Sequence, residues 1–130
     1  MLVTAGAGGI GRVIAEQFQA SGYRVHVCDI EPQAVADFLA ANPHASATVA
    51  DVADPAMVAR VFTDLQVQHG RLDVLVNNAG ISGPIDAIEN IDPGDWDRTI
   101  RVDLNSHFYC ARESVPLLKK AGGGAIITVS

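Results

Sequence analysis

Hydrophobic and polar residues follow two patterns that alternate along this chain. Short, mostly apolar runs predict five buried strands, over Leu2–Ala5, Arg24–Asp29, Ala45–Ala50, Leu72–Asn77 and Ala125–Ser130. Between these runs, apolar residues recur every three or four positions, which is typical of helices. Four helices are predicted in this way, over Ile10–Ala20, from Pro32 onward, from Asp54 to Gly70, and from Asp92 to about Lys120. The chain is therefore predicted to alternate strand and helix throughout.

This alternation has a topological consequence. A strand can return to a parallel neighbour only through a long crossover, and a helix supplies that length. The sequence therefore predicts an α/β fold with a doubly wound parallel sheet, Rossmann-like, with helices on both faces and with the chain truncated after the fifth strand. Because such crossovers are right-handed, a ligand crevice is expected at the carboxyl ends of the first, second and fourth strands.

The longest predicted helix is apolar on more than one side. Its main stripe consists of Trp96, Ile100, Leu104, Phe108, Ala111, Val115 and Leu118. Further apolar or aromatic residues lie off this stripe, at Val102, Tyr109, Cys110 and Leu117. A helix with this pattern is usually buried on both sides. Pro116 is expected to bend the helix near its end.

Length and composition narrow the class of protein. The 130 residues match one domain, residues 1–130, and 48% apolar against 18% charged residues suits a compact globule. Nine Lys and Arg against 15 Asp and Glu give a net charge of −6, which disfavours nucleic acid as a partner. No apolar run approaches the roughly 18 residues of a membrane span, so no membrane association is expected.

Targeting signals and metal-ligand patterns are also not apparent. The first residues lack the basic region and cleavage site of a signal peptide, so a cytoplasmic location is expected. Cys28 and Cys110 lie in apolar contexts and are predicted to be reduced core thiols. The four histidines are scattered, and no Cys or His cluster has metal-ligand spacing, so no metal site is expected.

A glycine-rich stretch, "VTAGAGGIG" at Val3–Gly11, follows the first predicted strand and opens the first helix. There, glycines let the backbone approach a pyrophosphate, and the helix N-terminus supplies free N–H groups. Two spacings fit: a dinucleotide fingerprint counted from Gly6, and a longer Thr-Gly-x-x-x-Gly-x-Gly motif with Ala5 at its first glycine. The cofactor-binding residues predicted here are Gly6, Gly8, Gly9, Ile10 and Gly11. A purely structural turn is the alternative.

Asp29 ends the second predicted strand and is followed by Ile30. An acid at this point accepts hydrogen bonds from an adenosine ribose diol, so both residues are predicted to contact cofactor. A carboxylate would repel a 2′-phosphate, and no Lys or Arg lies in the glycine loop or directly after Asp29. NAD is therefore favoured over NADP. A helix-capping acid before Pro32 is an alternative that is compatible with this role.

Four motifs together resemble the short-chain dehydrogenase/reductase family. They are "VTAGAGGIGR", the pair Asp51-Val52, "NNAG" at Asn77–Gly80, and "WDRTIRVDLNSHFYCAR" at Trp96–Arg112, and they span nearly the whole chain in order. The resemblance implies that Asp51 and Val52 meet the adenine, and that Asn78, Ala79 and Gly80 line the ribose side and steady the sheet. It also implies a homodimer or homotetramer packed through the long helix, with Ile81–Pro84 near the substrate.

Two residues depart from the family pattern. The loop has Ala5 where the family has glycine; if this position needs a positive φ, alanine costs on the order of 1 kcal/mol, unless Gly6 absorbs the turn instead. Asp103 occupies the position of a family asparagine that helps hold a water in a proton relay. Aspartate accepts hydrogen bonds but has no amide donor. Asp103 is thus a candidate catalytic residue, with a solvated or capping acid as the alternative.

The resemblance also implies a catalytic Tyr-x-x-x-Lys pair, which these residues lack: Tyr23 is followed four positions later by Val27, and Tyr109 by Glu113. The chain is therefore expected to be the N-terminal, cofactor-binding half of an NAD-dependent enzyme that interconverts an alcohol and a carbonyl. A non-catalytic dinucleotide-binding or interaction module is the alternative. A methyltransferase, whose glycine loop is similar, is disfavoured because "NNAG" has no part there.

Overall fold

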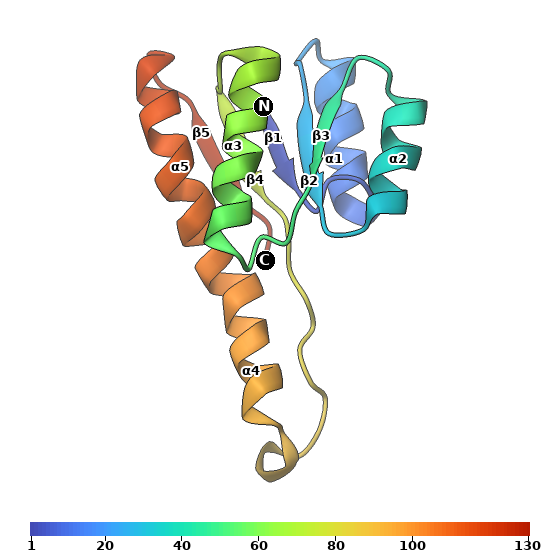
Figure 1. Ribbon diagram of the computed structural model, residues 1–130, viewed down its shortest axis with the longest axis vertical. Coiled ribbons are helices and arrows are strands. Elements are labelled where there is room, and N and C mark those ends of the chain that lie inside the picture. The colour runs from blue at the N-terminus through green and yellow to red at the C-terminus, as the bar shows by residue number, and fades with distance from the viewer.

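The computed structural model describes residues 1–130 and contains a single five-stranded sheet. Its strands are β1 (Leu2–Thr4), β2 (His26–Asp29), β3 (Ser46–Val49), β4 (Val74–Asn77) and β5 (Ala125–Thr128). They are all parallel and lie in the order β3-β2-β1-β4-β5 (Figure 1). The five predicted strands are confirmed, although each is shorter than its apolar run. The predicted doubly wound α/β fold is confirmed as well.

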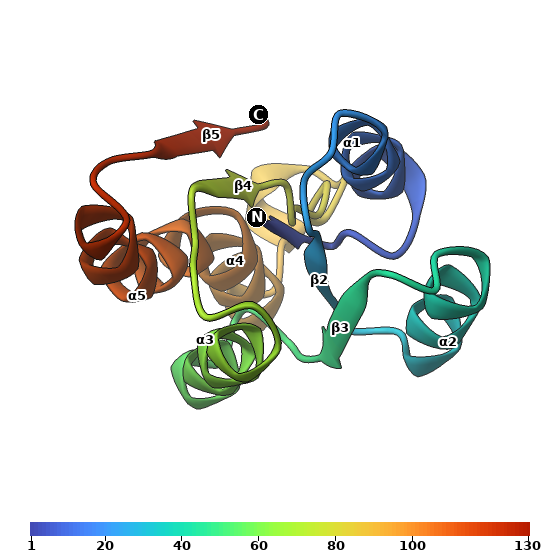
Figure 2. The same ribbon diagram turned by 90° about the horizontal axis from the view of Figure 1, so that it is seen from above.

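Helices cover both faces of the sheet (Figure 2). The α-helices are α1 (Gly9–Ala20), α2 (Pro32–Ala41), α3 (Pro55–His69), α4 (Pro93–Ile100) and α5 (Ser106–Lys120). One layer contains α1 and α2, and the other contains α3 and α5. The cap signals read from the sequence are confirmed for α3: the Asp54 carboxylate accepts from the Ala56 N–H at 2.8 Å, and Gly70 ends the helix with a φ of 68°.

Successive residues of the strands enter two different cores, because side chains alternate between the faces of a sheet. The core on the α3 and α5 side includes Leu2, Cys28, Leu75, Phe62 and Leu65. The core on the α1 and α2 side includes Val3, Val27, Val76, Ala15 and Phe38. Both cysteines are buried and unpaired, as predicted.

The long predicted helix is divided by a π-helical segment, η2 (Arg101–Asn105), which connects α4 to α5. The buried residues of η2 and α5 together are Val102, Ser106, Cys110, Ser114 and Leu118. Four members of the predicted stripe, Trp96, Leu104, Phe108 and Val115, are exposed instead. The prediction that the apolar stripe is the buried face is therefore wrong for these four residues. Small side chains form the buried face instead, because they let the helix approach its neighbours closely. No helix in the chain combines the length and the hydropathy that a membrane crossing requires.

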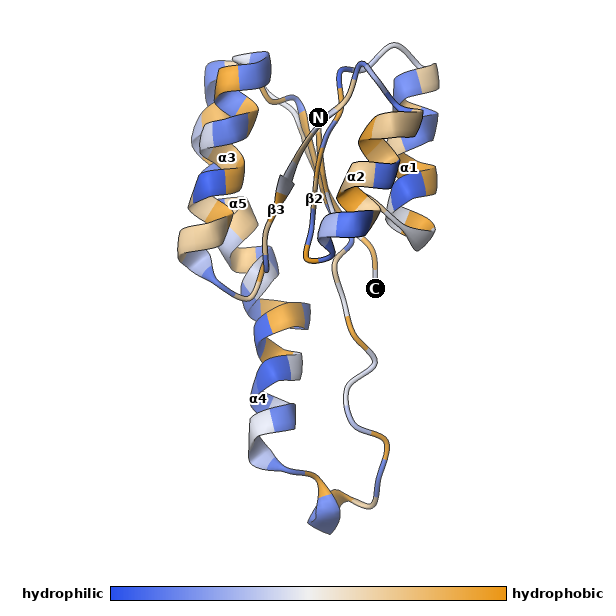
Figure 3. Ribbon diagram, turned by 45° about the vertical axis from the view of Figure 1, so that its right-hand side comes forward, coloured by the Kyte–Doolittle hydropathy of each residue, from blue (hydrophilic) through white to orange (hydrophobic).

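The segment between β4 and α5 projects beyond the carboxyl edge of the sheet (Figure 1). It consists of an extended loop, a short 3-10 helix η1 (Ile88–Asn90) that was not predicted, and the returning helix α4. Hydrophobic ribbon segments lie on this projection as well as on the sheet (Figure 3). The projection therefore forms one wall beside the carboxyl ends of the strands.

Candidate cofactor-binding site

The strand order sets the position of the candidate site. β1 lies between β2 and β4. After β1 the chain builds β2 and β3 on one side of it, and then crosses over to build β4 and β5 on the other side. In open α/β sheets the crevice at such a switch point, outside the carboxyl ends of the strands, is the place where ligands bind. The predicted cofactor residues lie at this edge, in the loops after β1, β2, β3 and β4, in the first turn of α1 and at the last residue of β2.

The loop after β1 makes a sharp turn at Ala5. Its φ of 48° is the only positive value at a non-glycine residue, and Gly6 is not among the glycines with positive φ. The prediction that Gly6 could absorb the turn is therefore wrong. Gly6 has a different constraint, because a Cβ there would lie 2.8 Å from the Val27 Cβ and from the Val3 carbonyl oxygen.

Gly11 brings the start of α1 against the loop. A Cβ at this position would lie 2.1 Å from the Ala5 carbonyl oxygen and 2.6 Å from the Asn78 Nδ2. Gly8 and Gly9, by contrast, have no neighbouring atom within 4 Å of an added Cβ, and Gly9 has a φ of 50°. The loop therefore has a packed side at Gly6 and Gly11 and an open side at Gly8 and Gly9.

The open side coincides with the N-terminus of α1. Gly8 is its N-cap residue, with no side chain that caps the helix. The first N–H groups of a helix have no partner within the helix and carry partial positive charge. This end of α1 therefore offers uncapped backbone donors on a surface that glycines keep free of side chains, which is the arrangement that binds phosphate groups.

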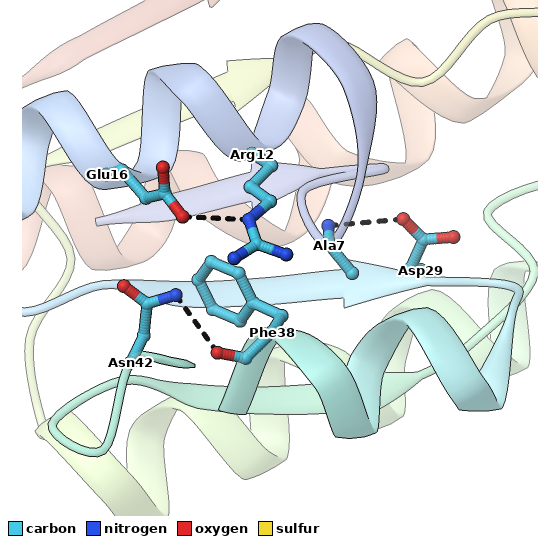
Figure 4. A network of polar contacts seen from close by, with 6 residues as sticks. All are labelled: Ala7, Arg12, Glu16, Asp29, Phe38 and Asn42. Carbon is cyan, nitrogen blue, oxygen red and sulfur yellow. Dashed lines mark hydrogen bonds and ion pairs between the residues drawn. The ribbon is translucent and has the colours of Figure 1, made fainter. Parts of the chain in front are cut away.

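Asp29 connects the glycine loop to the start of α2. Its Oδ2 accepts from the Ala7 N–H at 3.2 Å (Figure 4), and its Oδ1 accepts from the Glu31 N–H at 3.3 Å. Each carboxylate oxygen keeps a further acceptor position. Asp29 thus bonds the residue before α2 and none of the N–H groups of the helix itself, so the capping alternative is not realised. The side chain still presents acceptors to the cavity that it lines.

Thr4 and Asn78 hold the loops after β1 and β4 together. The Thr4 hydroxyl, which is buried, accepts from the N–H groups of Asn78 at 2.9 Å and Ala79 at 3.0 Å, and donates to the Val76 carbonyl at 3.4 Å. The Asn78 amide in turn donates to the Thr4 carbonyl at 3.1 Å and the Ala5 carbonyl at 3.2 Å. These bonds fix the glycine loop to the loop after β4, and Asn78 lies against Gly11.

Asp51 follows β3 and lies opposite α4. Its Oδ1 accepts from the Ala53 N–H at 2.9 Å, and its Oδ2 accepts from the Arg98 Nη1 at 3.1 Å in an ion pair. A cavity of about 100 Å³ lies beside this pair. Six predicted residues line it together: Asp29, Ile30, Asp51, Val52, Ala79 and Gly80.

Asp103 lies on the π-helical segment η2. Its Oδ1 accepts from the Ile81 N–H at 2.8 Å, which ties the helix to the loop after "NNAG". Ile81 lines the 100 Å³ cavity, whereas Asp103 does not. π-Helical turns are rare and frequently lie at functional sites. Asp103 therefore fixes the wall of the crevice through a backbone bond.

The two thiols lie apart from this chemistry. Burial raises the pKa of Cys28 well above its ordinary value and raises the pKa of Cys110 to about 12. A thiol is a nucleophile only as its thiolate, so neither cysteine is an activated nucleophile at neutral pH.

Comparison with known proteins identifies the family of this chain. A family model described as short chain dehydrogenase matches residues 1–130, the whole of the chain. The chain belongs to the short-chain dehydrogenase family. This membership excludes the methyltransferase alternative.

Relatives and solved structures agree with this family. The chain is 37% identical to a 3beta-hydroxysteroid dehydrogenase of Mediterraneibacter gnavus, over 100% of this chain and 48% of the relative. It superposes with a TM-score of 0.93 and 37% identity on a 3-ketoacyl-ACP reductase from Sinorhizobium meliloti, covering 99% of this chain and 52% of the other. A 3-ketoacyl-(acyl-carrier-protein) reductase from Brucella melitensis complexed with NADH gives a TM-score of 0.94 at 26% identity, with 99% and 55% covered.

The chain spans about half the length of the curated relatives that it matches. Within this short-chain dehydrogenase portion, the structure gathers the predicted residues into two neighbouring groups. Asp29, Ile30, Asp51, Val52, Ala79 and Gly80 line the cavity, and Gly6, Gly8, Gly9 and Gly11 form the adjoining loop. Asn78 lies beneath that loop, and Ile10 lies on the exposed face of α1 with 67% of its surface accessible.

Sequence reasoning missed two residues of this short-chain dehydrogenase site. Thr4 was read as part of a buried strand, and the signal that could have identified it is a hydroxyl among apolar residues directly before the glycine loop. Arg98 was quoted only within the long helix motif. Its contact with Asp51 joins residues 47 positions apart, and no local pattern marks it.

Proposed function

We propose that this chain binds NAD at the carboxyl edge of the sheet, and that it is the cofactor-binding portion of an oxidoreductase. The reaction would transfer a hydride between an alcohol or carbonyl substrate and the nicotinamide that NAD supplies. One observation carries the proposal: in a short-chain dehydrogenase fold, Asp29 and Asp51 line one cavity, and Asp29 also accepts from the Ala7 N–H, directly before the uncapped N-terminus of α1. The names of the relatives, which are dehydrogenases and reductases, support it.

The residues present fit such a dinucleotide. The open side of the glycine loop at Gly8 and Gly9 would receive the pyrophosphate on backbone N–H groups. The free acceptor positions of Asp29 would receive the ribose hydroxyls, and Asp51 beside Val52 would receive the adenine amino group. The chain's own residues bind and orient the cofactor in this assignment. The Tyr-x-x-x-Lys spacing does not occur within these 130 residues.

The charges near Asp29 favour NAD over NADP. A 2′-phosphate would meet the Asp29 carboxylate, which already accepts two backbone hydrogen bonds. The cation nearest to the loop in sequence is Arg12, and it is engaged elsewhere (Figure 4): its Nε donates to Glu16 at 2.8 Å, and its guanidinium lies 5.9 Å from the centre of the Phe38 ring. Arg98 lines the same cavity as Asp29 and is paired with Asp51, so both nearby arginines already have a carboxylate partner. This pairing favours NAD over a dinucleotide with a 2′-phosphate.

Calorimetric titration of the purified protein with NAD and with NADP tests this proposal. We expect NAD to bind at least about tenfold more tightly, a difference of about 1.4 kcal/mol. Asp29→Asn should reduce this preference, since it removes the charge and keeps an acceptor oxygen. Following NADH absorbance with a panel of alcohols then tests turnover in the full-length protein. Absence of NAD binding would refute the binding role, and binding without any turnover would favour the non-catalytic alternative.

The exposed face of the long helix supports a homodimer or homotetramer as part of this proposal. Trp96 in α4, Leu104 in η2 and Phe108 in α5 expose 55%, 62% and 63% of their surfaces. An apolar patch of this kind marks an interface on an otherwise soluble fold. We expect light scattering to give a mass of two or four chains. Leu104→Glu should shift the protein toward monomer, whereas Val67→Glu, at a still more exposed residue on α3, should not.

We also place the protein in the cytoplasm. Cys28 and Cys110 are buried, unpaired thiols, which is the state expected in a reducing compartment. Fractionation of the source cells, with detection of the protein by antibody, tests this location.

A further inference from the structure

Arg98 lies at a boundary between two hollows of the crevice. It lines the 100 Å³ cavity together with Asp29, Asp51 and Val52. It also lines a second, more open cavity formed by the loop residues Ile81–Pro84 and by Asp95 and Thr99 of α4. The guanidinium, half exposed, therefore separates the region assigned to adenosine from the region beneath the loop after "NNAG".

The Asp51 carboxylate is fixed at both of its oxygens. Oδ1 accepts from the Ala53 N–H at 2.9 Å, and Oδ2 accepts from the Arg98 Nη1 at 3.1 Å. The first bond comes from the same loop, two residues further on. The second comes from α4, in the segment that projects beyond the carboxyl ends of the strands (Figure 1). Only the bond from Arg98 therefore connects this carboxylate to α4.

A carboxylate held by two donors still has unused lone pairs, because each oxygen can accept more than one hydrogen bond. An ionised carboxylate is also an acceptor only, so it can bond the 6-amino group of adenine and repels the 6-oxo group of hypoxanthine. The orientation of Asp51 thus decides how well an amino group is recognised. Fixing a polar group before binding increases affinity, since less freedom is lost in the complex.

We propose that Arg98 is a positioning residue for Asp51, and that the pair selects a 6-aminopurine dinucleotide at the cofactor site. This inference rests on the proposed function, because it assigns a further residue to the adenine end of that site. Arg98 acts through the Asp51 carboxylate, to which its Nη1 donates at 3.1 Å. Its effect is therefore confined to the part of the ligand that Asp51 reads.

The test compares NAD with nicotinamide hypoxanthine dinucleotide, in which a 6-oxo group replaces the 6-amino group. Calorimetric titrations use the purified wild-type protein and the variants Arg98→Gln and Arg98→Lys. We expect Arg98→Gln to weaken NAD binding about three- to tenfold, which is about 0.7–1.4 kcal/mol, and to change binding of the hypoxanthine analogue less than about twofold. Arg98→Lys, which keeps the charge but not the planar fork, should recover part of the loss.

Two controls separate this role from a general effect of charge. Arg101→Gln removes one exposed positive charge from the adjoining π-helical segment, at a residue with no hydrogen bond or ion pair to Asp51, and should bind both dinucleotides as the wild type does. In an Asp51→Asn background, Arg98→Gln should have little additional effect, because coupled residues are not additive. Thermal unfolding of each variant shows that it is folded.

The possible outcomes discriminate between the two proposals. If the wild type binds neither dinucleotide, the proposed function fails, and the role of Arg98 fails with it. If the wild type prefers NAD and Arg98→Gln keeps the same affinities, the role of Arg98 alone is overturned. Tighter NAD binding by Arg98→Gln would also overturn it, since the ion pair would then compete with adenine. If Arg98→Gln weakens the binding of both dinucleotides equally, its effect does not depend on the group at the 6-position, and the proposed role of Arg98 is overturned as well.

Discussion

Two glycines of one loop should respond to the same substitution in opposite ways. Gly11→Ala places a Cβ 2.6 Å from the Asn78 Nδ2 and 2.1 Å from the Ala5 carbonyl oxygen. The second distance is more than 1 Å shorter than an ordinary van der Waals contact. Gly8→Ala places a Cβ in open space, at a residue with the extended φ of −141°. The first substitution should therefore perturb folding, and the second should perturb ligand binding.

The magnitude for Gly11→Ala follows from three contributions. Overpacking against the backbone costs about 1–3 kcal/mol. The Asn78 amide donates to the Thr4 and Ala5 carbonyls, and losing these bonds adds about 1 kcal/mol each. The higher helix propensity of alanine offsets about 1 kcal/mol. We expect the free energy of unfolding to fall by about 2–4 kcal/mol.

For Gly8→Ala, the absence of neighbours predicts a change in unfolding free energy within about 0.5 kcal/mol. The added methyl group would nevertheless stand on the open surface assigned to the pyrophosphate. We expect NAD affinity to fall about tenfold, which is about 1.4 kcal/mol. A binding defect in a fully stable variant would be hard to explain if the loop were only a tight turn.

Urea unfolding and NAD titration of both variants provide the measurement. With a slope of about 2 kcal/mol per molar urea, Gly11→Ala should unfold about 1–2 M earlier than the wild type. Gly8→Ala should unfold at the wild-type midpoint. Two results would refute the reasoning: a Gly11→Ala midpoint equal to that of the wild type, or an NAD affinity that Gly8→Ala leaves unchanged.

Three further predictions concern residues around the same sheet. Ala5 has a positive φ, so Ala5→Val should lower the free energy of unfolding by about 1–3 kcal/mol. Ala5→Gly should leave this free energy unchanged or raise it by up to about 1 kcal/mol. Equal urea midpoints for the two variants would contradict a strained φ at this residue. Asp103→Asn keeps an acceptor for the Ile81 N–H and should unfold as the wild type does, whereas Asp103→Leu should lose about 1 kcal/mol, with equal midpoints as the contradicting result. Burial lowers the pKa of His26 from 6.5 to about 4. As the pH falls, the histidine is therefore protonated in the unfolded chain before it is protonated in the folded one. The free energy of unfolding should decrease between pH 6.5 and 4, by up to about 1.4 kcal/mol per pH unit. In urea titrations between pH 7 and 5, His26→Gln should show a shallower dependence, and an unchanged slope would contradict this assignment.

The sequence predicted the fold well because its signals are local. Apolar runs marked the five strands, and the cap residue Asp54 with Gly70 marked both ends of α3. The long helix was the exception, because its most hydrophobic stripe is not its buried face. Hydropathy favours Leu104 and Phe108 over Ser106 and Ser114, yet the small side chains are the ones that pack inward. The π-helical segment also alters the helical period, and a pattern analysis that assumes 3.6 residues per turn does not register it.

The candidate site was predictable only where a motif or resemblance identified it. The family pattern implied contacts for Asp51, but its partner Arg98 comes from a helix 47 positions away. The Thr4 hydroxyl likewise bonds the Asn78 and Ala79 N–H groups 74 and 75 positions along the chain. Such pairs depend on the order of the strands in the sheet, and periodicity carries no information about them.

The polar contacts of the crevice divide the loop backbone into two functional sets. Thr4, Asn78 and Asp29 bond to backbone groups of the loops after β1 and β4, which holds these loops in one shape. No side chain caps the helix that begins after Gly8, so the donors there are left for a ligand. A binding loop that is already ordered loses less freedom when the ligand arrives, and more of the contact energy is expressed as affinity. Side chains thus shape the cradle, and the bare backbone offers the contacts within it.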